Sequence, residues 1–404
     1  MPDSSHPASR GLPRSRGDPL VEAELRRRIR ARGRISFAEF MEVALYLPSA
    51  GYYQVHAEIG PQGDFLTSPE THPAFGALLA RLCMLMWRTT GSPGQFGVIE
   101  YGAGTGSLCR QILEAVPLLS PGFAAALEYG IVEVSSALRA RQQARLADLG
   151  DRVQWVQPRE PTPPAAGCVL ANEVVDALPV HRLRVVNGRV REIYVGLAAD
   201  RYLELLGPVS RPELESRLRD AGVQPPEGST LEINLAAREW LREASNRLKS
   251  GYMVIIDFGG SERDLYAGAS RRGGLKCFYR HAWTDDPYDR PGWQDLTAPV
   301  DFTDLVRSGR ELGLEVMAEL SQRELLASLG LKAALSRLET MGLPVVERER
   351  NKKAMQALLD PAGLGGYRVL VQGEAAPPLT MVSACGGELQ PLPLLPQERV
   401  DWPE

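Results

Sequence analysis

The chain has 404 residues, more than one hydrophobic core usually serves, so we expect a main domain with a sizeable insertion or second lobe. Its 44% hydrophobic and 24% charged residues are typical of a globular protein, and a net charge of −4 provides no basic surface for nucleic acid. Five scattered cysteines form no metal-binding or disulfide pattern, and no apolar run reaches the roughly 18 to 20 residues of a membrane span. We therefore expect no metal site, no nucleic-acid partner and no membrane span.

Both ends of the chain differ in composition from the rest. Residues 1–19 are rich in Pro, Ser, Gly and Arg and lack an apolar face, which favours a disordered tail over the alternative of a transit peptide. Residues 376–404 form a Pro-rich C-terminal extension. Because the start of the chain has no secretory signal, we expect the protein to stay where it is made. For a bacterial source that compartment is the cytoplasm, whereas for a eukaryotic source, with the alternative of a transit peptide, we expect the mitochondrial matrix.

The first elements are predicted to be helices. Apolar residues between Val21 and Leu47 recur at helical spacing and predict two short helices broken around Gly33. The long loop that follows carries aromatic residues, which is typical of binding loops. A helix with one apolar face is then predicted at about residues 73–88.

Strands and helices alternate over the middle of the chain. After a strand, glycine-rich turn and helix in FGVIEYGAGTGSLCRQILEAV, we expect strands at 129–135, 153–156, 167–175 and 251–259, with helices at 136–149 and 234–249. This alternation predicts an α/β fold with a Rossmann-like sheet covered by helices on both faces. LEVMAEL and YRVLVQG are predicted to pair as an antiparallel edge hairpin.

An insertion is expected to divide this sheet into two halves. Alternating apolar residues flank Asn187-Gly188, a strong hairpin signal, so residues 181–230 are predicted to form an antiparallel insertion. Residues 20–180 would then hold the N-terminal helices and the cofactor-binding half of the domain, and residues 231–375 the second half.

The glycine-rich turn is the clearest binding signal. Gly102, Gly104 and Gly106 lie between a strand and a helix, where glycine permits a tight turn and close approach of a ligand. Ser107 stands where a dinucleotide fingerprint needs glycine, and no phosphate-loop lysine follows. Glu100 would repel a pyrophosphate but suits the cationic groups of S-adenosylmethionine. A tight turn without a ligand remains the alternative.

Polar residues at the ends of the next strands extend this candidate site. Glu133 can accept hydrogen bonds from ribose hydroxyls, although a solvated carboxylate is the alternative. Asn172, Glu173 and Asp176 follow an apolar strand, and the two carboxylates could hold a guanidinium group in line with a methyl donor. The alternative is that they cap a following helix. Asp257 ends the fifth strand, where a site role and simple strand termination both remain open.

Seven segments, in order, resemble the MidA family of methyltransferases. They are GYY, GDFLTSPETHPAFG, EYGAGTGSL, ANEVVDALPVHR, IDFG, LKCFYRH and DLTAPVDFTDL. The resemblance implies a class I methyltransferase fold that binds S-adenosylmethionine, and a mitochondrial branch of the family methylates an arginine of a respiratory complex I subunit. It also implies that residues of the long loop close over the cofactor, namely Gly63, Asp64, Phe65, Thr67, Ser68, Pro69 and Glu70. Val174 and Val175 depart from the bulkier residues usual in the family.

We therefore expect an S-adenosylmethionine-dependent methyltransferase acting on an arginine of a partner protein, with Glu173 and Asp176 as catalytic residues. Glu100, the three glycines of the turn, Glu133, Asn172 and the long-loop residues are the expected cofactor ligands. A non-catalytic assembly factor or chaperone is the first alternative, and an NAD-dependent oxidoreductase is the second. The methyl acceptor and the oligomeric state remain open, a homodimer included.

Overall fold

The computed structural model describes residues 17–61, 63–157, 165–199, 201–280, 282–379 and 392–395. Residues 1–16 of the expected tail and most of the C-terminal extension lie outside this part of the chain. Helix α1 (Pro19–Arg32) begins within the last residues of the expected tail, because Asp18 accepts hydrogen bonds from the N–H groups of Leu20 and Val21 and so caps it.

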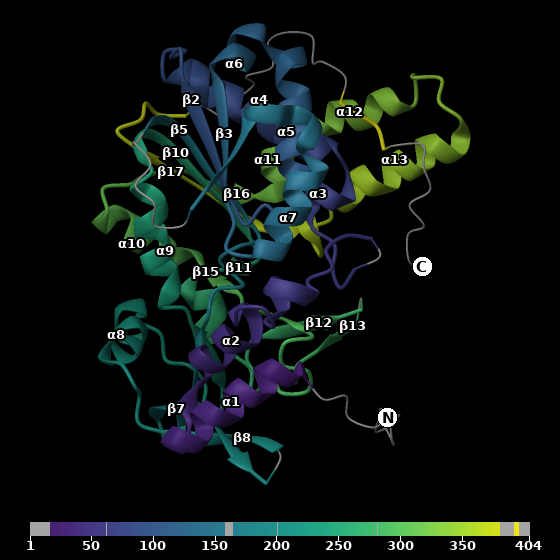
Figure 1. The fold of residues 1–404 in the computed structure, drawn as a ribbon. Coiled ribbons are helices and arrows are strands. Elements are labelled where there is room, and N and C mark those ends of the chain that lie inside the picture. Colours follow the sequence, from purple (N-terminus) through teal and green to yellow (C-terminus); the bar gives the residue numbers. More distant parts are fainter. Residues whose placement is uncertain are drawn as a thin grey trace, which may run out of the picture.

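A seven-stranded sheet of order β16-β17-β10-β5-β2-β3-β4 forms the upper part of the molecule in Figure 1. Its strands are β2 (Phe96–Tyr101), β3 (Leu127–Val132), β4 (Val153–Val156), β5 (Ala165–Asn172), β10 (Leu248–Asp257), β16 (Glu315–Ser321) and β17 (Arg368–Glu374). β17 is antiparallel to both of its neighbours, whereas the strands from β10 to β4 are parallel. The predicted fold class and the predicted pairing of the last two strands are confirmed.

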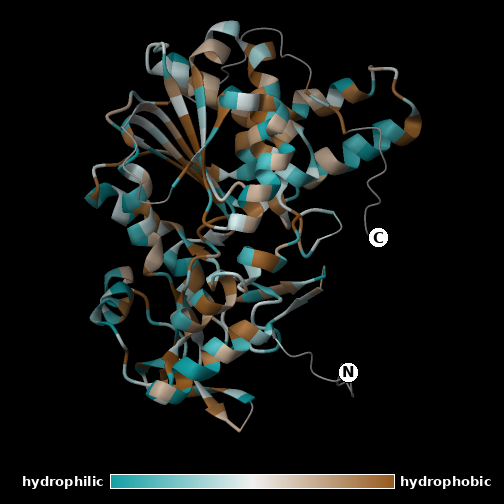
Figure 2. Ribbon diagram, in the orientation of Figure 1, coloured by the Kyte–Doolittle hydropathy of each residue, from teal (hydrophilic) through white to brown (hydrophobic). Residues whose placement is uncertain are grey.

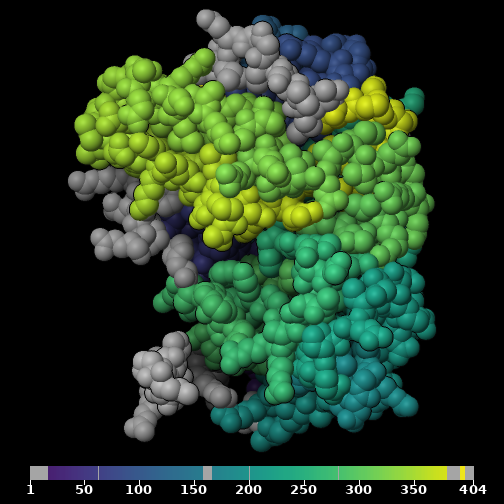
Figure 3. Space-filling model, turned by 180° about the vertical axis from the view of Figure 1, so that it is seen from behind, coloured from purple at the N-terminus to yellow at the C-terminus, as the bar shows by residue number. Residues whose placement is uncertain are grey.

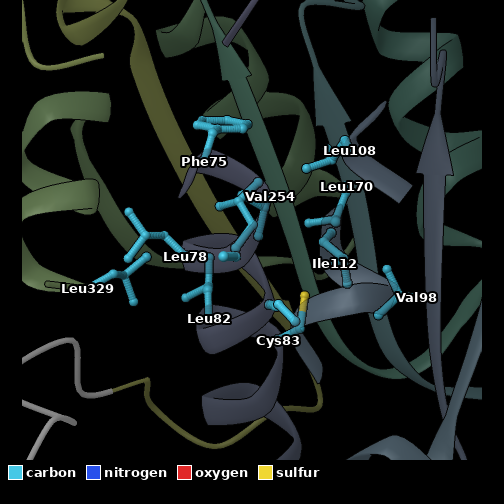
Figure 4. Packing of buried hydrophobic residues seen from close by; sticks show 14 of the residues in the cluster. Phe75, Leu78, Leu82, Cys83, Val98, Leu108, Ile112, Leu170, Val254 and Leu329 are labelled. Carbon is cyan, nitrogen blue, oxygen red and sulfur yellow. The ribbon is translucent and has the colours of Figure 1, made fainter. Parts of the chain in front are cut away.

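Helices cover both faces of this sheet. Figure 4 shows α4 (Ala74–Thr89) directing Leu78 and Leu82 toward Val98, Leu170 and Val254 of the strands. The other face packs against Trp240 of α9 and Phe302 of α10. The remaining helices of this part are α3 (Ser68–Thr71), α5 (Ser107–Leu119), α6 (Pro121–Ala126), α7 (Ser136–Arg145), α9 (Ala236–Ser245), α10 (Phe302–Glu311) and α11 (Gln322–Ser328).

Two further helices, α12 (Leu331–Leu338) and α13 (Val345–Ala357), project to one side of the sheet in Figure 1. Figure 2 shows that the central strands are rich in hydrophobic residues, whereas α13 carries mostly hydrophilic residues after the exposed Val345 and Val346 at its start. In the described part of the chain, no helix combines the length and the apolarity that crossing a membrane requires.

A second, lower lobe is built from segments far apart in the sequence (Figure 1). Its larger sheet has the order β1-β7-β6-β9, with β8 paired to β7. The elements of this lobe are β1 (Ile35–Ser36), α2 (Phe37–Tyr46), β6 (His181–Val186), β7 (Arg189–Ala198), β8 (Arg201–Gly207), α8 (Pro212–Ala221), β9 (Thr230–Ile233), β12 (Lys276–Tyr279), β13 (Ala282–Thr284) and β14 (Asp295–Thr297). Two short strands, β11 (Gly259–Gly260) and β15 (Val300–Asp301), pair parallel to each other.

The lower lobe is therefore larger than the expected insertion at 181–230. Ile35 pairs with Val195, so the N-terminal segment supplies a strand that local sequence patterning does not reveal. Phe37 and Phe40 of α2 pack against Tyr288, which closes a core shared by these distant segments. The two helices α1 and α2 end and begin around Gly33, as predicted.

Three glycines lie side by side across the central strands of the upper sheet. Gly97 of β2 is in register with Gly167 of β5, which is in register with Gly251 of β10. A Cβ atom on Gly167 would lie 2.1 Å from the carbonyl oxygen of Gly97, closer than any real contact. A Cβ atom on Gly97 would meet no described atom within 4 Å.

We predict that Gly167→Ala lowers the free energy of unfolding by roughly 1–3 kcal/mol, because the added methyl group must push two strands apart. Urea titration followed by circular dichroism measures the change. Gly97→Ala is the matched control and should leave stability unchanged or slightly raised. An equal effect of the two substitutions would contradict this account of the strand spacing.

Candidate functional site

A cavity of about 970 Å³ lies at the carboxyl ends of β2, β3 and β5, where residues of both lobes line it. Its size is in the upper range of cavities that bind small molecules and cofactors. Figure 3 shows the molecule hollowed between its upper and lower parts. In open α/β sheets ligands bind at this end of the strands. The cavity is therefore the candidate active site.

The glycine-rich turn forms part of the cavity floor. Gly102, Gly104 and Gly106 have φ angles of 60°, 54° and 84°, values that favour glycine. Gly102 and Gly104 line the cavity. Gly106 is not among the lining residues; it is the N-cap of α5, and a Cβ atom on it would lie 3.3 Å from the Leu146 side chain. Its predicted contact with the cofactor stays a prediction.

The cavity is strongly acidic. Among the described residues that line it, one side chain, Lys276, carries a positive charge, and its ammonium lies 5.4 Å from the centre of the Phe258 ring. The acidic lining residues are Glu42, Asp64, Glu70, Glu100, Glu133, Glu173, Asp176, Glu243 and Asp295. Carboxylates on low-dielectric walls attract cations and repel anionic groups such as a pyrophosphate.

Two of these carboxylates lie beside the glycine turn: Glu100 is on β2, the strand that leads into the turn, and Glu133 directly follows the neighbouring strand β3. Glu100 is 3% exposed and accepts a 2.8 Å hydrogen bond from the Tyr129 hydroxyl, and burial raises its pKa to about 8. Glu133 accepts hydrogen bonds from the Ser135 N–H and from Nε2 of Gln142, at 2.8 and 2.9 Å. Burial also raises the pKa of Glu133. Both side chains are thus fixed beside the turn.

Asn172 is the last residue of β5, the other neighbour of β2, and Glu173 follows it. Oε1 of Glu173 accepts hydrogen bonds from Nδ2 of Asn172 at 3.0 Å and from the Ser68 N–H at 3.3 Å. Oδ1 of Asn172 is buried and has no partner among the described residues. A buried acceptor left without a donor is costly, so this oxygen marks a place for a ligand donor. Burial, followed by the charge of Asp257, raises the pKa of Glu173 to about 8.

Asp257 holds the turn that carries these residues. Its Oδ2 accepts hydrogen bonds from the N–H groups of Val174, Val175 and Asp176, at 3.2, 3.0 and 3.2 Å. These bonds fix the backbone directly after Glu173, which has an unusual φ of 56° for a residue with a side chain. Asp257 is the last residue of β10, the strand next to β5, and its side chain holds the turn after β5 in position.

Asp176 was expected to be catalytic or to cap a helix. The described chain has no helix between β5 and β6, so the capping alternative is wrong for both Asp176 and Glu173. Asp176 is 7% exposed, and burial together with the charges of Asp257 and Asp295 raises its pKa well above the usual range. Asp295 of β14 approaches from the lower lobe, and burial raises its pKa to about 7.

The long loop reaches the cavity from the N-terminal side. Of the loop residues predicted to close over the cofactor, those that line the cavity are Asp64, Phe65, Thr67, Pro69 and Glu70. Ser68 does not line the cavity, but its hydroxyl donates to Oε1 of Gln322 and its N–H donates to Glu173. Gly63 lies outside the lining, and a Cβ atom there would meet the backbone of Glu58.

Two carboxylates fasten this loop in place. Glu70 accepts hydrogen bonds from the hydroxyls of Thr105 and Ser107 in the glycine-turn segment. Asp64 accepts hydrogen bonds from the Tyr52 hydroxyl at 2.8 Å and from the Arg280 N–H at 2.6 Å. The loop is thus attached to the upper lobe through one carboxylate and to the lower lobe through the other.

Sequence reasoning did not name the lining residues that come from the lower lobe and its neighbouring loop, and from α9. They are Glu42, Tyr46, Tyr53, Trp240, Glu243, Lys276, Phe278, Asp295 and Thr297. A signal was present for several of them, because Tyr53, Lys276, Phe278, Asp295 and Thr297 lie in the segments GYY, LKCFYRH and DLTAPVDFTDL that resemble the family. Their roles depend on strand pairing between distant segments, which those segments do not reveal.

The residues present fit S-adenosylmethionine. The glycine turn gives close access to the backbone, the carboxylates suit the ammonium and sulfonium, and Oδ1 of Asn172 needs a donor. An NAD pyrophosphate would face the same carboxylates, which argues against the oxidoreductase alternative.

Comparisons with known proteins agree with this chemistry. Residues 78–319 match the family of S-adenosyl-L-methionine-dependent methyltransferases. A mitochondrial protein arginine methyltransferase of Drosophila melanogaster, the NDUFAF7 homologue, is 30% identical over 86% of this chain and 83% of its own length. The corresponding mouse protein is also 30% identical, over 85% of this chain and 79% of its own.

A solved structure from Burkholderia thailandensis, bound to S-adenosyl-homocysteine, superposes with a TM-score of 0.79 and 30% identity. The match covers 91% of this chain and 95% of that one. The resemblance to the MidA family and the predicted cofactor are confirmed. The chain belongs to this family of S-adenosyl-L-methionine-dependent methyltransferases.

Proposed function

We propose that the protein transfers the methyl group of S-adenosylmethionine to an arginine side chain of a partner protein. The observation that carries the proposal is the acidic lining around the unpartnered oxygen of Asn172, at the end of the glycine-turn sheet. A cavity of this charge accepts two cations together, the sulfonium cofactor and a guanidinium. The names of the relatives, protein arginine methyltransferases, support arginine as the acceptor.

The cofactor would be held by residues of the upper lobe. Gly102 and Gly104 admit it close to the backbone, and Glu100 faces the region suited to its ammonium group. Glu133 is placed to accept from ribose hydroxyls, and the loop fastened by Glu70 covers the turn. When bound, the cofactor supplies an electrophilic methyl carbon on its sulfonium.

Glu173 is the residue we propose as general base. Methylation of a guanidinium releases a proton, and a base works best when its pKa lies near the working pH. The pKa of Glu173 is raised to about 8 by burial and by Asp257, which suits this task. Asp176, beside it on the same turn, would orient the guanidinium by charge-assisted hydrogen bonds.

We base the proposed partner and compartment on the family. The resemblance to the MidA family supports a respiratory complex I subunit as the methylated partner. The names of the relatives place them in mitochondria, which supports the mitochondrial matrix for a eukaryotic source. For a bacterial source we propose the cytoplasm, and we propose a homodimer as the assembly to test by light scattering.

Calorimetric titration should show that the protein binds S-adenosylmethionine and does not bind NADH. Gly104→Val should abolish binding, because a side chain there would enter the cavity floor near Ile59 at a φ of 54°. Gly188→Val is the matched control, since its φ of 68° imposes similar strain in a hairpin away from the cavity. NADH binding without S-adenosylmethionine binding would refute the proposal.

Glu173→Gln should lower methyl transfer to an arginine peptide by roughly 10²-fold or more, while the affinity for S-adenosylmethionine changes by only a few-fold. Transfer of labelled methyl from the cofactor, followed by amino-acid analysis, measures the first quantity, and calorimetry measures the second. Glu128→Gln, an exposed change on β3, is the control. Equal loss of both quantities would place Glu173 in the cofactor site, and absence of transfer by the unaltered protein would favour the assembly-factor alternative.

The stability gain from Glu173→Gln should grow with pH. The folded protein holds the proton of Glu173 more tightly than the unfolded chain does, since its pKa is raised from 4.5 to about 8. Above pH 4.5 the unfolded chain loses this proton while the folded protein keeps it to about pH 8, so the fold loses stability across this window, by up to roughly 1.4 kcal/mol per pH unit. Urea titrations of both proteins across this window measure the difference, and a difference independent of pH would contradict the shift.

A further inference from the structure

The cavity has two differently built halves. One half is formed by the glycine turn and Glu133 of the upper lobe. The other half lies between the turn at residues 173–178 and side chains of the lower lobe, including Tyr53 and Asp295. With the cofactor on the glycine turn, the second half is left for the methyl acceptor.

Two stacked tyrosines form a wall of this second half. The rings of Tyr46 and Tyr53 lie 5.6 Å apart at an interplanar angle of 21°. The Tyr46 hydroxyl donates to the carbonyl oxygen of Ala177 at 3.0 Å, and the Tyr53 hydroxyl donates to Oδ1 of Asp295 at 2.8 Å. Both hydroxyls thus donate to acceptors within the protein. The tyrosine pair extends from the turn after β5 to Asp295 of the lower lobe.

The carboxylates at either end of this wall retain free acceptor oxygens. Oδ1 of Asp295 accepts both hydrogen bonds made to that side chain, from Tyr53 and from the Leu296 N–H. Its Oδ2 accepts none from the described residues, and the Asp176 carboxylate interacts with the Ala177 backbone N–H. Asp295 is 1% exposed and Asp176 is 7% exposed, and both line the cavity, so a bound cation can reach their remaining acceptor positions.

Resting on the proposed function, we propose that Asp295 and Asp176 together hold the guanidinium of the substrate arginine beside Tyr46 and Tyr53. A guanidinium has five N–H donors in a plane, so it can bridge two carboxylates from separate elements and lie against aromatic rings. An ammonium has three donors on one atom and satisfies this arrangement less well. Asp295 is the residue that makes the site selective for arginine over lysine.

This subsite requires both lobes. Asp176 follows β5 of the upper sheet, whereas Asp295 begins β14 of the lower lobe. The Ala298 N–H donates to the Asp176 carbonyl oxygen at 2.9 Å, which fixes the two segments relative to each other. The lower lobe thus supplies a specificity-determining carboxylate, a role beyond covering the cavity.

Calorimetry with two small probes tests the proposal directly. In the presence of S-adenosyl-homocysteine, the protein should bind N-acetyl-arginine amide more tightly than N-acetyl-lysine amide. Asp295→Asn should weaken the arginine probe by roughly tenfold to a hundredfold, because a charge-assisted bond is lost, while the affinity for S-adenosyl-homocysteine stays unchanged. Asp285→Asn, an exposed change in the same lobe, is the matched control and should alter neither affinity.

Equal binding of the two probes, binding of neither, or an unaltered arginine affinity in Asp295→Asn would overturn the subsite. Because Asn has the same shape as Asp and keeps one acceptor oxygen for the Tyr53 hydroxyl and the Leu296 N–H, Asp295→Asn should fold as well as the unaltered protein. If it does not fold, Tyr53→Phe, which keeps the ring and removes one donor to Asp295, gives a second variant that should change arginine affinity alone. Failure of the proposed function can be distinguished from failure of the subsite, because in that case the unaltered protein would transfer no methyl group to arginine.

Discussion

The burial of carboxylates at the carboxyl end of the sheet is the constraint on which the site depends. Asp257 compensates for its burial by accepting three consecutive backbone N–H groups after Glu173. Those bonds hold Glu173 in a conformation that directs it toward Ser68 and Asn172. A buried carboxylate without such partners would be neutralised or would destabilise the fold. The hydrogen bonds to Asp257 therefore set the conformation of the turn after β5, and this turn places Glu173 and Asp176 in the cavity lining.

The same desolvation gives the cavity its chemistry. Glu100 and Glu173 have pKa values raised to about 8, and Asp295 to about 7, because burial penalises their charged forms. Without a ligand, protons reduce that penalty. A cation that enters the cavity takes the place of those protons and stabilises the ionised carboxylates. The site is thus expected to bind cations, and a sulfonium cofactor and a guanidinium acceptor are both cations.

The two lobes supply different residues to the cavity. The upper sheet provides the glycine turn and the carboxylates of the cofactor half, while the lower lobe provides Tyr53 and Asp295. The long loop joins them, since Glu70 is bonded to the glycine-turn segment and Asp64 to the Arg280 backbone. Loop, turn and lobe are held by separate hydrogen bonds, which explains why residues distant in sequence surround one cavity.

The sheet, the glycine turn and the acids near it can be predicted from the sequence, because hydrophobic periodicity and turn chemistry are local properties. It also indicated Glu133, Asn172 and Glu173 as strand-end residues. Only the folded structure shows that Gly106 and Ser68 lie outside the cavity lining, that β1 joins the lower lobe, and that Asp295 lines the same cavity as Asp176. The physical reason is that pairing between distant strands and the desolvation of a carboxylate depend on neighbours that the local sequence does not specify.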